Sequence, residues 1–419
     1  MKFQSLVDVY EKLEKTSSGN TMQTILSEFF KKVPADEIGL VAYLTLGSLA
    51  SEFEGVVLGM AEKTVLKAIS LAGGIDSNKV RMLMKEKGDA GLVAEEVMKK
   101  KPRTLIPVGM LSIEELFKGL HKIAEAGGGG SQELKVQILA KMLQKCSSSG
   151  AKYLMRIALG TLRMGVGDMT VLNSLAIAFT GEKKNKEFLE TAYNICPDVG
   201  VIAEKIAKNG LAGVKRVSVK VGRPIKMMMA QRVKELEEIT KKIPGEITVE
   251  AKYDGERIQA HKNSKGDVKL FSRRMEEVTD QFPDLVEYLK KAVRGKEFII
   301  EGEIIAVGKK EEPLPFQVLM QRRRKYDIEE YIKKVPIHYK VFDLLYLNGK
   351  SYLNEAYFKR TEKLASIIHE NKEVHPAEQI VTSSLGEMQE FFEKMLADGY
   401  EGVIVKSRAD DSVYQAGVR

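Results

Sequence analysis

Cysteine is scarce in this chain of 419 residues, and tryptophan is absent. The two cysteines, Cys146 and Cys196, lie far apart and do not show the Cys-x-x-Cys spacing of zinc ribbons and redox motifs. The five histidines show no pair at the spacing of a zinc finger or a helical metal site. We therefore expect neither a disulfide framework nor a structural zinc ion.

Long apolar runs are also missing from the sequence. No run approaches the roughly 20 residues that a membrane-spanning helix needs. The first 16 residues, MKFQSLVDVYEKLEKT, have the pattern of an amphipathic helix and not of a signal peptide. We therefore expect a cytoplasmic protein without a membrane partner.

The composition is that of a globular, multidomain protein. Hydrophobic residues make up 44% of the chain, enough for two or three cores at this length. The formal net charge is +8 in a chain that is 30% charged. This basic excess favours polyanionic partners without requiring them.

The first half of the chain has helical periodicity almost throughout. Apolar residues recur every three to four positions in several stretches: 3–13, 22–30, 56–71, 113–123, 134–143, 171–179 and 202–206. No fixed repeat length is found, which disfavours a solenoid. The sequence predicts an all-α N-terminal domain over residues 1–212.

The pattern changes at residues 214–221, where apolar and polar residues first alternate with a period of two, before Gly222-Arg223-Pro224 interrupts it. We assign 213–232 to a linker and 233–419 to a second domain of α+β class. Strands are predicted at 247–253, 257–261, 268–271, 298–307, 337–347 and 402–406. Helices are predicted at 282–292, 358–369 and 385–396.

The segment Lys252-Tyr253-Asp254-Gly255-Glu256-Arg257 lies between two of the predicted strands. A lysine followed by Asp-Gly can be a nucleophile that a tight turn holds at a strand end. An attacking amine must be unprotonated, whereas a free lysine has a pKa near ~10.4. Alone, the pattern is more often a strand lysine that pairs with neighbouring carboxylates, so the other motifs have to decide.

Four further motifs follow in order: Phe271-Ser272-Arg273-Arg274-Met275-Glu276, Phe298-Ile299-Ile300-Glu301-Gly302-Glu303, Val341-Phe342-Asp343-Leu344-Leu345-Tyr346-Leu347-Asn348-Gly349 and Glu401-Gly402-Val403-Ile404-Val405-Lys406. Together with the lysine segment they resemble the nucleotidyltransferase motifs of ATP-dependent DNA ligases of the archaeal and eukaryotic replicative type. The resemblance implies an ATP-grasp-like nucleotidyltransferase fold for residues 233–419.

The resemblance also implies roles. Lys252 would attack the α-phosphorus of ATP to form lysyl-AMP. The implied nucleotide-binding residues are Glu250, Arg257, Arg273, Glu303, Phe342, Lys406 and Arg419. Glu303 and Glu401 would bind Mg²⁺, which prefers hard oxygen ligands. Without the resemblance, Phe342 would be a core residue, the two glutamates members of buried ion pairs, and the arginines solvated.

Several residues are predicted to contact DNA. The basic cluster 321–325 is either a solvated charge run or a grip on the DNA backbone, through Arg322 and Arg324. The glycine-rich segment 126–132 is either a flexible linker or a phosphate contact, with Gly129 before a helix and Ser131 as its N-cap. The regions 150–154 and 160–170 resemble the DNA-binding domain of the same ligases, which adds Lys152, Arg163 and Gly165.

In the family, a fifth, lysine-bearing motif and an OB-fold domain follow the position of Arg419, and we expect this chain to lack them. The resemblance implies nicked double-stranded DNA and the replication sliding clamp as partners, a monomeric state and a nucleoid-associated, archaeal setting. Two alternatives stay open. The chain is an RNA ligase or capping-type nucleotidyltransferase, or it is a DNA-binding fragment without full ligation activity.

Overall fold

The computed structural model of the chain describes residues 1–100, 109–162, 164–323, 328–369 and 371–418. The chain forms two compact units. The helical unit comprises Met1–Tyr193 and Pro197–Val217, and the sheet unit comprises Asn194–Cys196 and Ser218–Arg419. None of the helices within the described ranges is long and apolar enough to cross a bilayer.

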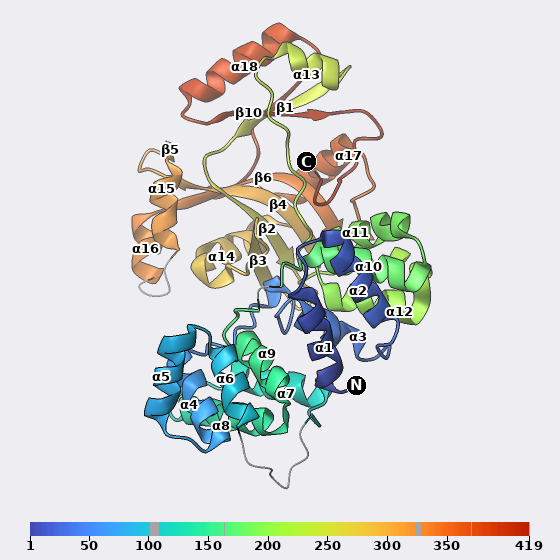
Figure 1. Ribbon diagram of the computed structural model, residues 1–419. Helices are drawn as coiled ribbons and strands as arrows, with labels where there is room; N and C mark the ends of the chain where they lie inside the picture. The colour runs from blue at the N-terminus through green and yellow to red at the C-terminus, as the bar shows by residue number, and fades with distance from the viewer. Residues whose placement is uncertain (101–108, 163, 324–327, 370, 419) are drawn as a thin grey trace. The chain divides into compact units, whose positions relative to one another are not determined.

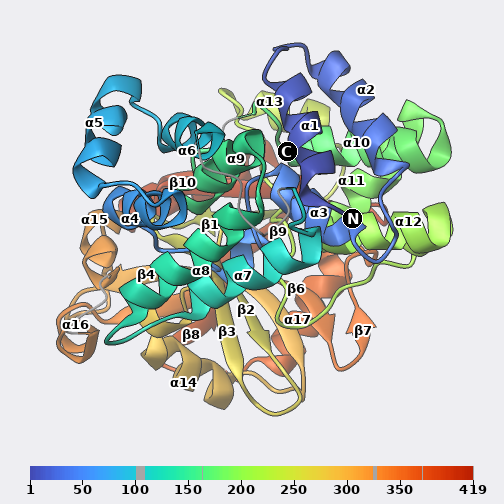
Figure 2. The same cartoon turned by 60° about the horizontal axis from the view of Figure 1, so that its bottom comes forward.

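The helical unit is built from α-helices and two short 3₁₀ turns. The helices are α1 (Phe3–Leu13), α2 (Gly19–Phe30), α3 (Ile38–Thr45), α4 (Glu62–Gly73), α5 (Ser77–Lys87), α6 (Ala90–Lys99), α7 (Ile113–Glu125), α8 (Ser131–Lys145), α9 (Ser148–Ala158), α10 (Asp168–Thr180), α11 (Lys186–Ile195) and α12 (Val199–Lys215), with 3₁₀ turns η1 (Glu52–Glu54) and η2 (Lys183–Asn185). α8 packs beside α4, and α9 beside α6 (Figure 2). Their apolar stripes form one continuous core.

One predicted helix in this unit is shorter than expected. The apolar stripe 56–71 predicts a helix over its whole length, but α4 begins only at Glu62. Residues 56–61 instead form a non-helical segment in which Gly59 has a φ of 56°. The buried Lys135 donates a hydrogen bond of 2.9 Å to the carbonyl oxygen of Leu58 and holds this segment against α8. A tertiary contact therefore replaces the first helical turn.

The sheet unit contains a small antiparallel sheet, a large mixed sheet and several helices (Figure 1). The small sheet has the order β10–β1–β9, and the large sheet has the order β3–β2–β4–β6–β7, with β5 beside β4 and β8 parallel to β6. The strands are β1 (Ile247–Lys252), β2 (Glu256–Lys262), β3 (Val268–Ser272), β4 (Phe298–Val307), β5 (Pro313–Leu314), β6 (Ile337–Leu347), β7 (Lys350–Ser351), β8 (Val374–Pro376), β9 (Gln379–Thr382) and β10 (Gly402–Ser407).

The helices of the sheet unit cover both sheets. They are α13 (Glu237–Lys242), α14 (Pro283–Ala292), α15 (Phe316–Leu319), α16 (Ile328–Lys334), α17 (Tyr357–Ile367) and α18 (Leu385–Ala397), with 3₁₀ turns η3 (Thr279–Gln281) and η4 (Met320–Arg322). α13 and α18 contribute Ile239 and Met388 to the core beside the small sheet (Figure 1), and α14 contributes Leu285 to the core of the large sheet. The predicted fold class, helical first and α+β afterwards, is confirmed.

The alternating run 214–221 does not form a strand. α12 continues to Lys215, and residues 217–220 have no strand partner. Val219 and Val221 nevertheless pack on the cluster that contains Ile225, so the alternation does reflect burial. The polar backbone that follows is held by side chains of β2 instead of by a neighbouring strand, because the N–H groups of Gly222 and Ile225 donate to side chains there.

Candidate active site

The turn 253–255 joins the two sheets of the sheet unit. β1 ends at Lys252 in the small sheet, and β2 begins at Glu256 in the large sheet. A Cβ atom at Gly255 would lie 2.1 Å from the carbonyl oxygen of Ile304 on β4. Only glycine therefore allows the turn to approach the large sheet this closely, and the turn fixes where Lys252 lies.

A cavity of about 1100 Å³ lies next to this turn. Its walls come from β1, β2, β4, β6, β10 and the start of α17. The volume is slightly above the range of about 300–1,000 Å³ that is typical of ligand pockets. It is lined by Lys252 and by every described residue that the sequence predicts to bind nucleotide: Glu250, Arg257, Arg273, Glu303, Phe342 and Lys406.

Lys252 forms an ion pair with Glu401, which comes directly before β10. The two side chains are 46% and 42% exposed, so both remain accessible to a ligand. The antiparallel register of β1 and β10 places Lys252 opposite Gly402, and the N–H of Glu401 donates to the carbonyl oxygen of Lys252 at 2.9 Å. The backbone pairing of the small sheet thus brings the predicted nucleophile to a predicted metal ligand.

Glu303 lies opposite Arg257 in the register of β2 and β4. The pKa of the Glu303 carboxyl is raised from 4.5 to about 8, chiefly by burial and to a lesser degree by the carboxylates of Glu256 and Asp254, against the lowering effect of Arg257 and Lys252. The carboxyl therefore lacks sufficient positive charge in its surroundings. A divalent cation bound there would supply it.

No group of three or more histidine, cysteine or carboxylate side chains is arranged to hold a metal within the described ranges. Mg²⁺ is usually bound by one or two carboxylates together with waters and substrate phosphates, and it does not need such a group. Glu303 and Glu401 both interact with Lys252, so both carboxylates lie near the same amine. Two carboxylates, one of which has too little positive charge around it, suit a cation that binds together with a nucleotide.

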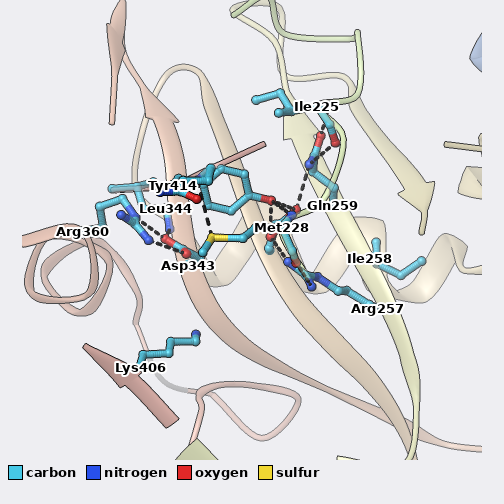
Figure 3. A network of polar contacts seen from close by, with 12 residues as sticks. Ile225, Met228, Arg257, Ile258, Gln259, Asp343, Leu344, Arg360, Lys406 and Tyr414 are labelled. Atoms are coloured by element: carbon cyan, nitrogen blue, oxygen red, sulfur yellow. Dashed lines mark hydrogen bonds and ion pairs between the residues drawn. The ribbon is translucent and has the colours of Figure 1, made fainter. Parts of the chain in front are cut away.

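Arg257 lines the cavity, where it lies beside Met228 (Figure 3) and forms an ion pair with Glu301. Its guanidinium donates to Glu301 at 2.6 Å and to the carbonyl oxygen of Met228 at 2.7 Å. Glu301 is fully buried and also accepts hydrogen bonds of 3.0 Å from the hydroxyl of Tyr414. The ring of Phe342 lies 5.3 Å from the guanidinium carbon, so Arg257 is oriented by a buried carboxylate and an aromatic face.

A chain of hydrogen bonds extends from Glu301 to the segment 222–228. Gln259 donates to Glu301 at 2.9 Å and to the carbonyl oxygen of Ile225 at 3.1 Å, and its own amide oxygen accepts from the N–H of Ile225 at 2.7 Å. His261 lies 2.8 Å from the same oxygen, and its Nδ1 accepts from the N–H of Gly222. Burial, with a smaller effect of a nearby lysine, lowers the pKa of His261 to about 3, so the ring is neutral and donates through Nε2.

Glu250 lines the cavity from β1 and is 3% exposed. One carboxylate oxygen accepts from the hydroxyl of Tyr357, and the other accepts from Lys406 at 2.7 Å. The Lys406 ammonium also lies 4.9 Å from the ring centre of Phe342. The ring of Phe342 thus lies close to two cations, Arg257 and Lys406, and it lines the cavity instead of being enclosed in a core.

Asp343 and Arg360 form a second buried pair in the cavity wall. The guanidinium donates to both carboxylate oxygens of Asp343, at 2.7 and 2.9 Å. Arg360 also donates to the carbonyl oxygens of Glu355 and Ser412, at 2.9 and 3.2 Å. Ser412 accepts a further hydrogen bond of 2.8 Å from the N–H of Tyr357. The pair therefore links β6, α17 and the segment after β10.

Arg273 is exposed at the end of β3 and lines the same cavity. Within the described part of the chain its side chain has no ion pair or hydrogen bond. A free guanidinium at the rim is available to an anionic ligand.

Two family descriptions match this chain. The description "ATP dependent DNA ligase domain" matches residues 227–419, and "DNA ligase N terminus" matches residues 2–176. DNA ligase 1 of Methanosarcina mazei is 41% identical over 426 residues, an alignment that covers 100% of this chain and 72% of that protein. The chain belongs to the ATP-dependent DNA ligase family. The resemblance that the motifs carry is thereby confirmed.

Other relatives of this ligase chain agree. DNA ligase 2 of Korarchaeum cryptofilum is 40% identical over 421 residues, covering 100% of this chain and 70% of that protein. A solved structure named "Pmar-Lig_Pre." covers 99% of this chain and 76% of its own, with a TM-score of 0.53 and 15% identity, which shows a shared fold. These relatives give no support to the RNA-ligase or capping alternative.

Two predicted DNA contacts of the ligase chain lie around the start of α8. Gly129 is exposed. Ser131 is not the N-cap of the helix, because Gly130, with a φ of 79°, takes that position and Ser131 is the first helical residue. The left-handed conformation at Gly130 is open to glycine at little cost, which displaces the cap by one residue. Gly165 is exposed in a turn with a φ of 66°.

Two other residues that the sequence predicts to contact DNA have partners within the protein. Lys152 is only 14% exposed and pairs with Glu14 at 2.6 Å, so it has an internal partner. Arg322 is 2% exposed and donates to both oxygens of Asp284, at 2.5 and 2.9 Å, and to the carbonyl oxygen of Val335. Arg322 therefore supports the fold and does not face a ligand.

Three predicted site residues, Arg163, Arg324 and Arg419, lie outside the described residues.

The sequence interpretation missed four side chains that organise the cavity: Glu301, Asp343, Tyr357 and Arg360. Glu301 carried a usable signal, because it alternates with Glu303 on β4 and an apolar strand tolerates a carboxylate only with a partner. Tyr357 lies directly before the predicted helix 358–369; in the structure it begins α17, and Arg360 lies one turn further along the same face. Nothing local distinguishes that face from an ordinary core face.

Proposed function

We propose that this chain carries out ATP-dependent nick sealing through an adenylated lysine. The Lys252 amine attacks the α-phosphorus of ATP, so an N–P bond forms as the bond to pyrophosphate breaks. The adenylate then passes to the 5′-phosphate of a nick, and the 3′-hydroxyl displaces AMP as the phosphodiester forms. The three steps restate at atomic level what the family membership of the chain supports.

One observation carries this proposal: Lys252 stands at the edge of a nucleotide-sized cavity whose other walls present cations and an aromatic ring. Arg257, Arg273 and Lys406 supply positive charge for phosphates and hydroxyls, and Phe342 supplies a face for a base. A polyanion with a planar aromatic group is the ligand that such a lining favours. ATP has both features.

Glu303 and Glu401 would hold Mg²⁺ in this proposal. When bound by these two carboxylates, the ion would screen the negative charge of the phosphates from the incoming amine and would stabilise the charge that develops on pyrophosphate. Lys252 pairs with Glu401, so the amine has to leave that carboxylate and lose its proton before it attacks. Arg257, fixed by Glu301, orients the nucleotide while this happens.

We further propose that the helical unit binds the nicked duplex through backbone phosphates. A phosphate can approach the exposed glycine turns at Gly129 and Gly165 and the first turn of α8, which begins at Ser131, and the net charge of +8 of the chain favours a polyanion. Contact with a sliding clamp, a monomeric state and a nucleoid-associated place in the cell remain predictions. Light scattering of the chain alone and with clamp tests the first two.

The adenylation step is tested by mass spectrometry of the intact chain after incubation with ATP and Mg²⁺. The chain should gain the mass of one AMP, and Lys252→Ala should abolish this gain. Lys269→Ala is a matched control, because Lys269 is 50% exposed and also pairs with a carboxylate, Glu277, at 2.8 Å. It should label like the unaltered chain. Labelling that survives in Lys252→Ala, or is lost equally in Lys269→Ala, contradicts Lys252 as the nucleophile.

A further inference from the structure

The carboxylate of Glu250 has two protein donors inside the proposed nucleotide cavity. Tyr357 donates to Oε1 and Lys406 donates to Oε2 at 2.7 Å. An ionised carboxylate can accept about four hydrogen bonds, so each oxygen keeps a lone pair for a ligand. Glu250 is only 3% exposed, and its side chain cannot turn toward bulk water to satisfy that capacity.

Tyr357 can only be a donor in this arrangement. Burial, reinforced by the negative charge of Glu250, raises the pKa of the Tyr357 hydroxyl well above 10.0, so it keeps its proton. With a tyrosine hydroxyl and an ammonium already donating to it, Glu250 has no proton to offer and accepts only. A ligand group that reaches Glu250 must therefore bring a hydrogen-bond donor.

The position of Tyr357 is itself fixed. It is the first residue of α17, and its backbone N–H donates to Ser412 at 2.8 Å. One turn further along the same helix, Arg360 is clamped to Asp343 by two hydrogen bonds of 2.7 and 2.9 Å. The ring of Tyr357 is also covered by the Lys406 ammonium at 4.6 Å. The hydroxyl is thus a rigid donor, and it sets the direction of the Glu250 carboxylate.

We propose that Tyr357 is a positioning residue for base selectivity: it holds Glu250 as an acceptor-only group that admits the 6-amino group of adenine and disfavours a 6-keto purine. This inference rests on the proposed function of the cavity as a nucleotide site. A keto oxygen placed against Glu250 would leave two acceptors facing each other without a proton, which costs more than the loss of one neutral hydrogen bond. Without the Tyr357 hydroxyl, Glu250 keeps one donor and gains freedom to turn.

The test compares ATP with ITP, two triphosphates that differ at the 6-position of the base. Their dissociation constants are measured by calorimetry in Ca²⁺, which supports binding while limiting turnover. Tyr357→Phe should reduce the preference for ATP over ITP by about tenfold, mostly through weaker ATP binding, because one charge-assisted hydrogen bond contributes about that much. A purely structural role for Tyr357 would weaken both nucleotides equally and leave their ratio unchanged, which overturns the proposal.

Tyr346→Phe is the matched control. Its hydroxyl also donates to a carboxylate, Glu297, at 3.4 Å, but neither residue lines the cavity. The control should keep the ATP preference of the unaltered chain. A drop equal to that of Tyr357→Phe would show that the effect is not specific to Glu250 and would overturn the proposal.

A double-mutant cycle keeps the inference testable from the side of Glu250. Glu250→Gln introduces an amide donor, so it should also reduce the ATP preference, and adding Tyr357→Phe should change the ratio little further. Additive effects show that Tyr357 does not act through Glu250.

In the unaltered chain, ITP should bind more weakly than purine riboside triphosphate, which has neither group at position 6. Equal binding of the two contradicts an acceptor-only Glu250. If ATP does not bind at all, the proposed function fails, independently of this inference.

Discussion

The role of Arg322 separates a structural explanation of the basic cluster 321–325 from the DNA-binding one. Arg322 is 2% exposed, and in the pair with Asp284 the two side chains are 1% and 7% exposed. Asp284 lies in the first turn of α14, where a carboxylate is favoured by the helix dipole. The pair is therefore enclosed, with a bidentate geometry and an additional hydrogen bond to Val335.

Arg322→Met removes the cation but keeps an apolar stem of similar length. Asp284 would then be a buried charge without a partner, and such a loss costs about 3–5 kcal/mol of unfolding free energy. For a unit of this size each kcal/mol corresponds to about 2–4 °C, so the melting temperature of the sheet unit should fall by roughly 6–20 °C. The double variant Asp284→Leu with Arg322→Met should recover most of this loss, since no unpaired charge remains.

The assay is thermal unfolding followed by circular dichroism, because the chain has no tryptophan to report on the fold. The exposed Arg294, which has no side-chain partner in the described part of the chain, provides the control Arg294→Met, with an expected change within about 0.5 kcal/mol. A DNA contact at Arg322 predicts the opposite pattern: unchanged stability, weaker binding to nicked duplex and a salt slope reduced by about 1. That outcome would refute the structural role.

Two further predictions concern the cavity. The pKa of Glu303 is raised to about 8 in the folded chain and is near 4.5 in the unfolded chain, so the free energy of unfolding should fall as pH rises from about 4.5 to 8 and then level off. Urea unfolding at several pH values measures this profile, and Glu303→Gln should flatten this part of it. A profile that Glu303→Gln leaves unchanged contradicts the raised pKa. Gly255→Ala would place a Cβ atom 2.1 Å from the carbonyl oxygen of Ile304, so it should lower the free energy of unfolding by about 1–3 kcal/mol and weaken nucleotide binding. The control is Gly245→Ala, at a position with open space but a φ of 91°. It should lower the stability without changing nucleotide binding.

Much of the sheet unit could be predicted from the sequence because its strands are long and apolar. β4 and β6 have the bounds 298–307 and 337–347 that their patterns predict. The residues around Lys252 could be proposed because five motifs follow one another in a fixed order. The burial of Arg322 within a basic run could not be predicted, because its partner, Asp284, lies 38 residues away along the chain.

The side chains that orient the cavity were the least predictable, because their partners are distant in sequence. Tyr357 is 107 residues from Glu250, and Tyr414 is 113 residues from Glu301. Each of these contacts pairs a carboxylate on a strand with a donor from a later segment. The local sequence shows that such a carboxylate needs a partner, but not which segment supplies it.

These distant contacts also imply that the side chains around the cavity move together. Glu301 is shared between Arg257 and Tyr414, and Ser412 is shared between Arg360 and the backbone of Tyr357. A displacement of the segment 412–414 would therefore remove a donor from Glu301 and two from Ser412 at once. Since buried polar groups are costly to leave unpaired, Arg257 and Tyr357 would have to move with that segment. The position of residues 412–414 is thus coupled to Tyr357, which orients Glu250, and to Arg257, which orients the proposed nucleotide.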